Sequence, residues 1–287
     1  MQQKTTSYSV YKLIIPFFLI AIIVLSSCKK NEILPDEIKT YIHISHTRTD
    51  KNPYMDIIVE NMNFKKFDML WFGGDMATLT SADTVTMQHV DSIFNLGDEN
   101  TLWSLGNHDY TNLDLIQNFT HRPNYYTFHK DKITFFVTDT QDSLSNLVNE
   151  QKALFQQIVD TIQNSNYFIL LHHKLIWMYG NPNLEPLINS VSNAGLGSCF
   201  YCINPNNFYS DIYPGLVEMK KRGIEVICIG GDIGFNTKKF EYKTKDGIYF
   251  LASGINSGDP DNKILIFKNN LTTNQLKWQF KLLSDYQ

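Results

Sequence analysis

The feature that most constrains the fold is a repeated pattern in which an apolar, strand-like segment ends in a polar cluster. The five clusters are His46-Thr47-Arg48, Gly73-Gly74-Asp75, Gly106-Asn107-His108-Asp109, His172-His173 and Gly230-Gly231-Asp232-Ile233-Gly234. In α/β sheets, ligands bind outside the carboxyl ends of the strands. The clusters therefore predict one site at one edge of a sheet, where the glycines let the backbone turn sharply.

Short segments rich in β-branched and aromatic residues predict ten strands. These strands span residues 40–45, 69–72, 101–105, 125–129, 133–138, 167–171, 225–229, 248–252, 263–267 and 276–280. Apolar residues at helical spacing predict a helix over 150–163, and Pro214 begins a second helix that Gly223 ends. Strands and helices alternate early and strands crowd the end, so we expect an α/β fold with one mixed sheet or two packed sheets.

The first 27 residues have the pattern of an export signal. Lys4 and Lys12 precede an apolar run over 13–25, which is shorter than the roughly 20 residues that span a membrane. The run ends in Leu-Ser-Ser before Cys28, which resembles the lipobox of bacterial lipoproteins. This resemblance implies cleavage before Cys28 and lipidation of its thiol, and the alternative is a signal anchor that stays uncut.

We accordingly expect a signal peptide over residues 1–27, a tether over 28–38 and one domain over 39–287, with a loop-rich insertion at 174–214. The expected location is the envelope of a bacterium, in the periplasm or on the cell surface, with the outer membrane as the expected anchor. The chain has 25 basic and 29 acidic residues and a net charge of −4. That balance excludes a polycationic surface, so we expect no nucleic-acid partner.

Three clusters, Gly74-Asp75, Gly106-Asn107-His108-Asp109 and His172-His173, resemble blocks of the calcineurin-like metallophosphoesterases in order and spacing. Residues 133–140 also resemble an inner strand of that family, so the resemblance covers nearly all of 39–287. It implies an α/β fold in which two mixed β-sheets pack as a sandwich flanked by helices. It also implies hydrolysis of a phosphoester, from a small molecule or an envelope component.

The first and last clusters depart from the family pattern. The family has Asp-x-His and Gly-His-x-His where this chain has His46-Thr47-Arg48 and Gly231-Asp232-Ile233-Gly234. The resemblance therefore implies that one of two metal positions is lost. The other position keeps groups that can coordinate a divalent cation, namely Asp75, Asn107, His172 and Asp232. We expect one manganese, zinc or iron ion per chain, with His173 packed behind the ligands.

The implied mechanism is attack by a metal-bound hydroxide, because a divalent metal lowers the pKa of water from about 15.7 toward about 7. By resemblance, His108 contacts the phosphate or protonates the leaving oxygen, and Asp109 orients the His108 ring. His46 is a candidate ligand or base, or else a hydrogen-bonded structural residue. Arg48 either binds phosphate oxygens where the metal is lost, or pairs with Asp232 or another carboxylate.

The insertion carries six aromatic side chains that can stack on a ligand or form a small hydrophobic cluster. They are Trp177, Tyr179, Phe200, Tyr201, Phe208 and Tyr209. Cys199 and Cys202 have CxxC spacing, which in an exported protein favours a disulfide over a zinc or redox motif. Cys228, inside an apolar strand, is expected to be a buried thiol.

Two classes of function remain open. The first is a membrane-anchored, metal-dependent phosphoester hydrolase with a single metal. The second is a binding module that keeps the fold and has lost catalysis, because the first and last clusters have lost family ligands. Substitution of Asp75 separates the two, since only the enzyme needs the carboxylate for both metal content and hydrolysis.

Overall fold

The computed structural model describes residues 37–287, which form one compact unit. The signal peptide, Cys28 and most of the expected tether lie outside the described residues. Within 37–287, no helix combines the length and the apolar character needed to cross a membrane.

The described chain contains eleven strands in two sheets. Their bounds are β1 Ile38–Ile44, β2 Met69–Phe72, β3 Thr101–Trp103, β4 Tyr126–Lys130, β5 Ile133–Val137, β6 Tyr167–Leu171, β7 Glu225–Gly230, β8 Lys239–Lys243, β9 Tyr249–Ser253, β10 Lys263–Asn270 and β11 Gln275–Leu282. The first sheet has the order β11-β10-β1-β2-β3, and the second has the order β4-β5-β6-β7-β9-β8. Each sheet mixes parallel and antiparallel pairs: β1, β2 and β3 pair in parallel at one end of the first sheet, and β5, β6, β7 and β9 pair in parallel in the middle of the second.

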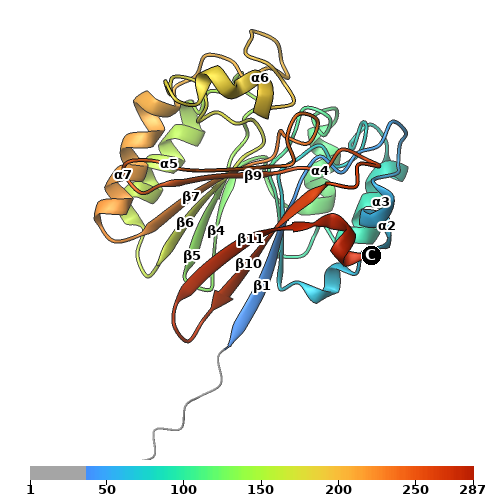
Figure 1. Cartoon of the computed structure of the whole chain (residues 1–287), viewed down its shortest axis with the longest axis horizontal. Coiled ribbons are helices and arrows are strands. Elements are labelled where there is room, and N and C mark those ends of the chain that lie inside the picture. Colours follow the sequence, from blue (N-terminus) through green and yellow to red (C-terminus); the bar gives the residue numbers. More distant parts are fainter. Residues whose placement is uncertain (1–36) are drawn as a thin grey trace, which may run out of the picture. The chain divides into compact units, whose positions relative to one another are not determined.

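Six α-helices accompany the sheets. They are α2 Ile57–Asn61, α3 Thr84–Phe94, α4 Leu113–Thr120, α5 Asn149–Thr161, α6 Ile188–Val191 and α7 Tyr213–Lys221. Shorter 3-10 turns span Phe64–Lys66, Glu185–Leu187 and Leu283–Tyr286, and a π turn spans Phe208–Ile212. In Figure 1, α5 and α7 flank one side of the sheets, and α2, α3 and α4 flank the other.

Three hydrophobic layers hold this arrangement together. The central layer lies between the sheets and includes Trp71 of β2, Phe135 of β5 and Phe267 of β10, all fully buried. One outer layer joins the first sheet to α3 and α4, and the other joins the second sheet to α5, α7 and the insertion. The expected sandwich of two mixed sheets flanked by helices is therefore confirmed.

Burial on both faces explains why the inner strands were readable from the sequence. All four residues of β2 are buried, and so are the last four of β6, as expected for continuous apolar runs in parallel strands. β8 was not predicted. It lies at the edge of the second sheet and alternates lysine or glutamate with partly buried aromatics, so its sequence lacks an apolar run.

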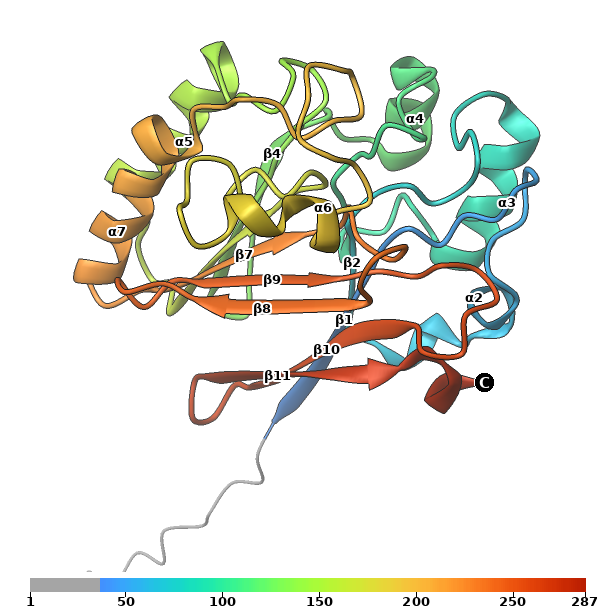
Figure 2. The same cartoon turned by 45° about the horizontal axis from the view of Figure 1, so that its top comes forward.

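The carboxyl ends of the parallel strands in the two sheets meet at one edge of the sandwich. The amide of Ile255, after β9, donates to Ser45 O after β1 over 3.2 Å. The Ser45 hydroxyl donates to Gly231 O after β7 over 2.8 Å. These bonds tie the loops of one sheet to those of the other, and α6 of the insertion lies above that edge in Figure 2.

Candidate active site

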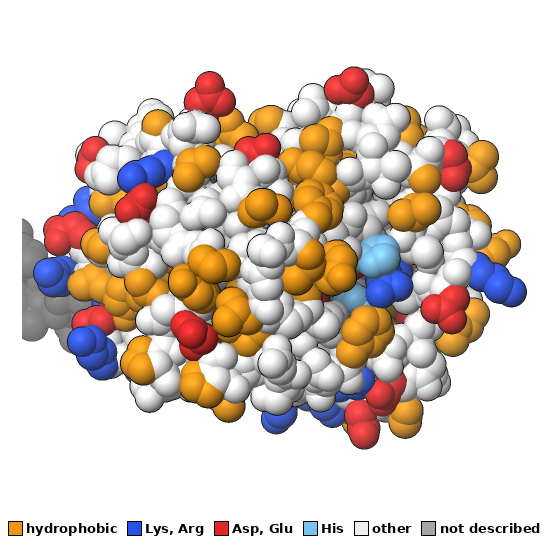
Figure 3. Space-filling model, turned by 90° about the horizontal axis from the view of Figure 1, so that it is seen from above, with side chains coloured by type: hydrophobic (Ala, Val, Ile, Leu, Met, Phe, Trp, Pro, Cys, Tyr) orange, Lys and Arg blue, Asp and Glu red, His pale blue; other side chains and the backbone are white. Residues whose placement is uncertain are grey.

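Residues from four of the five polar clusters line one pocket of about 400 Å³ at this edge. Its lining residues are His46, Arg48, Asp75, Asn107, His108, Asn193, Ala194, Tyr201, Asp232 and Phe235. Seen from above, histidine and basic side chains lie together and are bordered by hydrophobic side chains (Figure 3). Four of the clusters that the sequence predicts to share one edge thus lie around one pocket, and the His172-His173 cluster does not line it.

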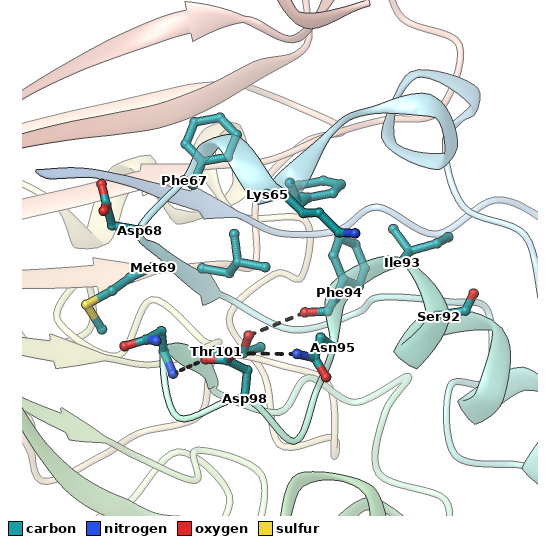
Figure 4. Close-up of a pocket in the computed structure, with 13 residues that line it drawn as sticks. Lys65, Phe67, Asp68, Met69, Ser92, Ile93, Phe94, Asn95, Asp98 and Thr101 are labelled. Atoms are coloured by element: carbon teal, nitrogen blue, oxygen red, sulfur yellow. Dashed lines mark hydrogen bonds between the residues drawn. The ribbon is translucent and has the colours of Figure 1, made fainter.

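A second hollow, of about 220 Å³, lies at the opposite ends of β2 and β3, beside Met69 and Thr101 (Figure 4). Beside it, Thr101 Oγ1 donates to Phe94 O and Asn95 Nδ2 donates to Asp98 Oδ2. This hollow contains none of the residues that the sequence singled out, so the first pocket is the candidate site.

Two glycine contacts allow the loops of the site to interlock. A Cβ at Gly231 would collide with Gly73 O, and a Cβ at Gly106 would collide with the Asp75 carboxylate. Only glycine permits backbones to approach so closely. Both glycines therefore fix where Asp75 and the neighbouring loops stand.

Asp75 lies at the centre of the site. Its backbone is left-handed, with φ of 58°, and its Oδ1 accepts from the His108 amide over 3.0 Å. Burial alone raises the pKa of Asp75, but His173, His46 and His108 outweigh burial and leave the pKa lowered. Asp75 is therefore held as a buried carboxylate, ready to accept a cation or a proton donor.

The structure corrects the assignment of the paired histidines. His173 Nε2 lies 3.7 Å from Asp75 Oδ1 and 4.0 Å from Asp232 Oδ1, while its Nδ1 bonds to Gly73 O over 2.6 Å. Burial lowers the pKa of His173, but Asp75 and Asp232 outweigh burial and leave it raised. His173, and not the predicted His172, therefore faces the two carboxylates.

His172 points into the core of the second sheet. Its Nδ1 bonds to Lys174 O over 2.7 Å, and its ring meets Trp177 edge-on at 6.5 Å between centroids. Burial lowers its pKa to about 3. Successive side chains of an extended segment point to opposite faces, so only one of the two histidines can enter the site.

Asp232 is the carboxylate contributed by the last cluster. It is buried, and the Ser192 hydroxyl from the insertion donates to its Oδ2 over 3.2 Å. Burial raises the pKa of Asp232, and this is partly offset by His173. The insertion is therefore joined directly to a candidate ligand.

The expectation that Asp109 orients His108 is wrong. Asp109 instead accepts from the amides of Asp75, Met76 and Gly106, at 2.7, 3.0 and 2.8 Å, and from Thr80 Oγ1 at 2.5 Å. Because both of its oxygens are occupied by the turn after β2 and its own turn, Asp109 fixes the backbone of the site.

His108 is oriented by a backbone carbonyl instead. Its Nδ1 lies 2.6 Å from Thr78 O, an acceptor that holds the proton on Nδ1. Nε2 is then the ring nitrogen left for a substrate, and the side chain lines the pocket.

His46 and Arg48 occupy the part of the pocket where the family pattern is altered. His46 Nδ1 bonds to Ile255 O over 3.0 Å, and its Nε2 lies 3.7 Å from Asp75 Oδ2. Burial lowers the pKa of His46 to about 4, so the ring is neutral at pH 7. Both side chains contact Phe235, with the Arg48 guanidinium 5.5 Å from the ring centroid.

Arg48 does not form the carboxylate pair that was its alternative role. Among residues 37–287, no ion pair of 4.0 Å or less involves its guanidinium. Its Nε is buried without a hydrogen-bond partner. The guanidinium is therefore available to an anion in the pocket.

The residues around Asp75 fit a divalent cation by their chemistry. His173 Nε2 is buried, has no hydrogen-bond partner and faces two carboxylates, and Asn107 adds an amide oxygen to the pocket. Ligands of a tetrahedral ion held at about 2.1 Å are about 3.4 Å apart, slightly less than the observed 3.7 and 4.0 Å. As the side chains stand, no set of three or more His, Cys, Asp or Glu residues within 37–287 encloses a metal.

The sequence did not point to several residues that shape the pocket. Asn193, Ala194 and Phe235 line it, and Asn193 Oδ1 accepts from the Phe235 amide over 2.7 Å. The available signal was an aromatic residue directly after the last glycine cluster. Cys199 and Cys202 form the expected disulfide, and Cys228 is the expected buried thiol.

No family model and no curated protein matches the sequence. Solved structures similar to the chain include a dimetal phosphatase from Danio rerio, with 10% identity over 87% of this chain and 99% of that one, at a TM-score of 0.48. An NAD nucleotidase from Haemophilus influenzae has 14% identity over 85% of this chain, at a TM-score of 0.41. This chain spans 49% of that nucleotidase. At such low identity these similarities carry no information about activity.

Proposed function

We propose that the chain is a metal-dependent phosphoester hydrolase that uses one divalent cation, held by Asp75, Asn107, His173 and Asp232. The observation that carries the proposal is Nε2 of His173, which is buried, has no hydrogen-bond partner and faces both carboxylates at 3.7 and 4.0 Å. An imidazole with two carboxylates and an amide oxygen suits manganese, zinc or iron. A cation there supplies Lewis acidity and makes water acidic near neutral pH.

The chain's own residues bind and orient the substrate. Arg48 offers its guanidinium to the phosphate oxygens, and Phe235 holds that guanidinium in place. His108, fixed through Nδ1 by Thr78 O, exchanges a proton with the leaving oxygen through Nε2. Neutral His46 lies beside Asp75 and offers Nε2 as a hydrogen-bond acceptor that would orient the attacking water.

The expected setting of the enzyme is part of the same proposal. The sequence ending at Cys28 supports export and lipid anchoring in a bacterial envelope, and the net charge of −4 gives no support to a nucleic-acid partner. The substrate is then a phosphoester, either a small molecule or a component of the envelope.

A binding module without catalysis is the second candidate, and one observation favours it. No set of three or more His, Cys, Asp or Glu side chains in residues 37–287 encloses a metal as positioned. A module of this kind would bind the phosphoester through Arg48 and leave it intact.

Phosphate release from a panel of phosphomonoesters and phosphodiesters, measured with manganese, zinc or iron, separates the two candidates. The hydrolase predicts turnover that falls at least about a hundredfold in Asp75→Ala. Asp114→Asn, which changes an exposed carboxylate of α4, should retain the wild-type rate. Equal rates in Asp75→Ala and wild type would rule out the proposed catalytic centre.

A further inference from the structure

The pocket has a polar side and an aromatic side. Arg48, Asp75 and His108 supply polar groups, whereas Ala194, Tyr201 and Phe235 supply apolar surface. Its volume of about 400 Å³ lies in the range of about 300–1,000 Å³ that accommodates whole organic ligands rather than a phosphate group alone. The pocket therefore has room for a second part of the substrate beside the aromatic residues.

The two aromatic rings of the pocket are exposed. Tyr201 is 57% exposed and Phe235 is 47% exposed, although both belong to large apolar or amphipathic residue types. Other rings of the insertion are used differently, since Trp177 and Phe208 are fully buried in the outer hydrophobic layer. Tyr201 is thus the ring of the insertion that lines the pocket.

Tyr201 is carried by a short loop, residues 196–203, whose ends form a parallel bridge between Leu196 and Ile203. The Cys199–Cys202 disulfide closes the turn around it, and the backbone of Gly197 pairs with Ile203 over 3.0 Å. Asn204, directly after this loop, donates from Nδ2 to Cys199 O over 3.0 Å. A ring held in this way loses little conformational entropy when a ligand packs on it.

A buried lysine holds the loop over 196–203 through a backbone carbonyl. The Lys174 ammonium donates to Phe200 O over 2.6 Å and lies 5.8 Å from the Phe200 ring centroid. Lys174 follows the paired histidines directly, so its hydrogen bond links the loop over 196–203 to the segment that carries His173.

Phe235 is held on its own loop by its amide and by its ring. Its amide donates to Asn193 Oδ1 over 2.7 Å, and its ring packs against His46 and Arg48. One face of the site thus combines a guanidinium for phosphate with aromatic surface for the rest of the ligand.

We propose that the site selects phosphoesters whose leaving group carries a planar aromatic ring, as a nucleoside does, and that this ring packs on Tyr201 and Phe235. The inference rests on the proposed function, because it describes the leaving-group side of the same pocket. Packing of a base on an aromatic side chain improves binding by roughly tenfold or more.

The test is isothermal titration calorimetry of the full chain in detergent with three probes: adenosine 5′-monophosphate, ribose 5-phosphate and hexyl phosphate. We expect adenosine monophosphate to bind about tenfold more tightly than each of the other two. Tyr201→Ala should remove most of that ratio, and Tyr201→Phe should keep it. Leu187→Ala, at another exposed apolar residue of the insertion, should leave it unchanged.

Phe235→Leu is the second variant, and it also frees Arg48. It should weaken the binding of all three probes. It should also lower the ratio of the affinity for adenosine monophosphate to the affinity for ribose 5-phosphate. Equal affinities of wild type for these two probes, or tighter binding of hexyl phosphate, would overturn the ring site. Phosphate release from ribose 5-phosphate by the same sample would then show that the proposed hydrolysis survives without it.

Discussion

At the scale of single residues, Asp109 shows how a motif residue can matter without touching a substrate. Its two oxygens accept from three backbone amides and one hydroxyl, all buried. The sequence places Asp109 at the site but cannot show whether its partners are a side chain or the backbone. Only the folded turn after β2 brings the amides of Asp75 and Met76 within reach.

We predict that Asp109→Ala destabilises the protein by about 3–5 kcal/mol, because several buried donors lose their acceptor. Urea unfolding followed by circular dichroism measures the change. Asp114→Ala, at an exposed position of α4, should alter the free energy of unfolding by no more than about 0.5 kcal/mol. A loss below about 1 kcal/mol in Asp109→Ala would refute the structural role.

His43 provides a pH-dependent prediction at a residue that is not a proposed ligand. It is fully buried in β1, and its Nδ1 lies 3.0 Å from Ser253 Oγ. Burial, helped by His172, lowers the pKa of His43 to about 3. The unfolded chain therefore binds a proton first as the pH falls, and the stability contributed by neutral His43 is complete above about pH 6.5 and is lost between pH 6.5 and 3.

In this window each pH unit removes about 1.4 kcal/mol of stability through His43. His43→Leu should make the plot of unfolding free energy against pH shallower by about that slope between pH 6 and 4.5. Urea titrations at several pH values give the comparison. An unchanged slope would mean that His43 titrates in the folded protein as it does in the unfolded chain.

The paired histidines mark the limit of residue-level prediction. Both are histidines at the end of one strand, and the pattern alone does not tell which faces the site. The choice depends on how β6 pairs with β7 and thus on which face of the second sheet each side chain leaves. In the structure, His173 is the one whose Nε2 faces Asp75 and Asp232.

At the scale of elements, the inner strands were predictable and the edges were not. The bounds of β2 and β6 agree with the sequence expectation because these strands are continuous apolar runs. The helix expected over 150–163 corresponds to α5, Asn149–Thr161. The edge strand β8 escaped prediction because charged residues alternate along it.

The loop over 196–203, which carries Tyr201, yields a prediction at this scale. Lys174→Met removes the ammonium that donates to Phe200 O, so this loop should open more often while the sheets remain intact. Limited digestion with chymotrypsin should then cleave after Phe200 or Tyr201 several-fold faster than in wild type.

Lys152→Met is the matched control, because the Lys152 ammonium pairs with Asp211, which is not part of the loop over 196–203. Its cleavage pattern should match that of wild type. If the loop of Lys174→Met resists chymotrypsin as well as that of wild type, the disulfide and the backbone hydrogen bonds suffice to hold Tyr201.

At the scale of the whole molecule, the sandwich brings together loops that are far apart in the sequence. Ser45 and Gly231 are 186 residues apart and share a hydrogen bond. The sequence predicted such a meeting from the strand ends. It could not predict the aromatic side of the pocket, because Tyr201 and Phe235 come from loops whose course depends on tertiary contacts.

The expected lipid anchor also belongs to this scale. We predict that wild type expressed in a bacterium incorporates labelled palmitate and that Cys28→Ser does not, because lipidation requires the thiol at the new N-terminus. Cys228→Ser, which changes a buried thiol, should incorporate label as wild type does. An unlabelled wild type whose mass includes residues 1–27 would favour the uncut signal anchor.

The most direct test of the central claim is the metal content of the full chain in detergent, after incubation with manganese, zinc or iron, desalting and elemental mass spectrometry. We expect one ion per chain in wild type and in His172→Gln, and none in Asp75→Ala or His173→Ala. No bound ion in wild type with any of the three metals, or an ion retained in both Asp75→Ala and His173→Ala, would contradict it.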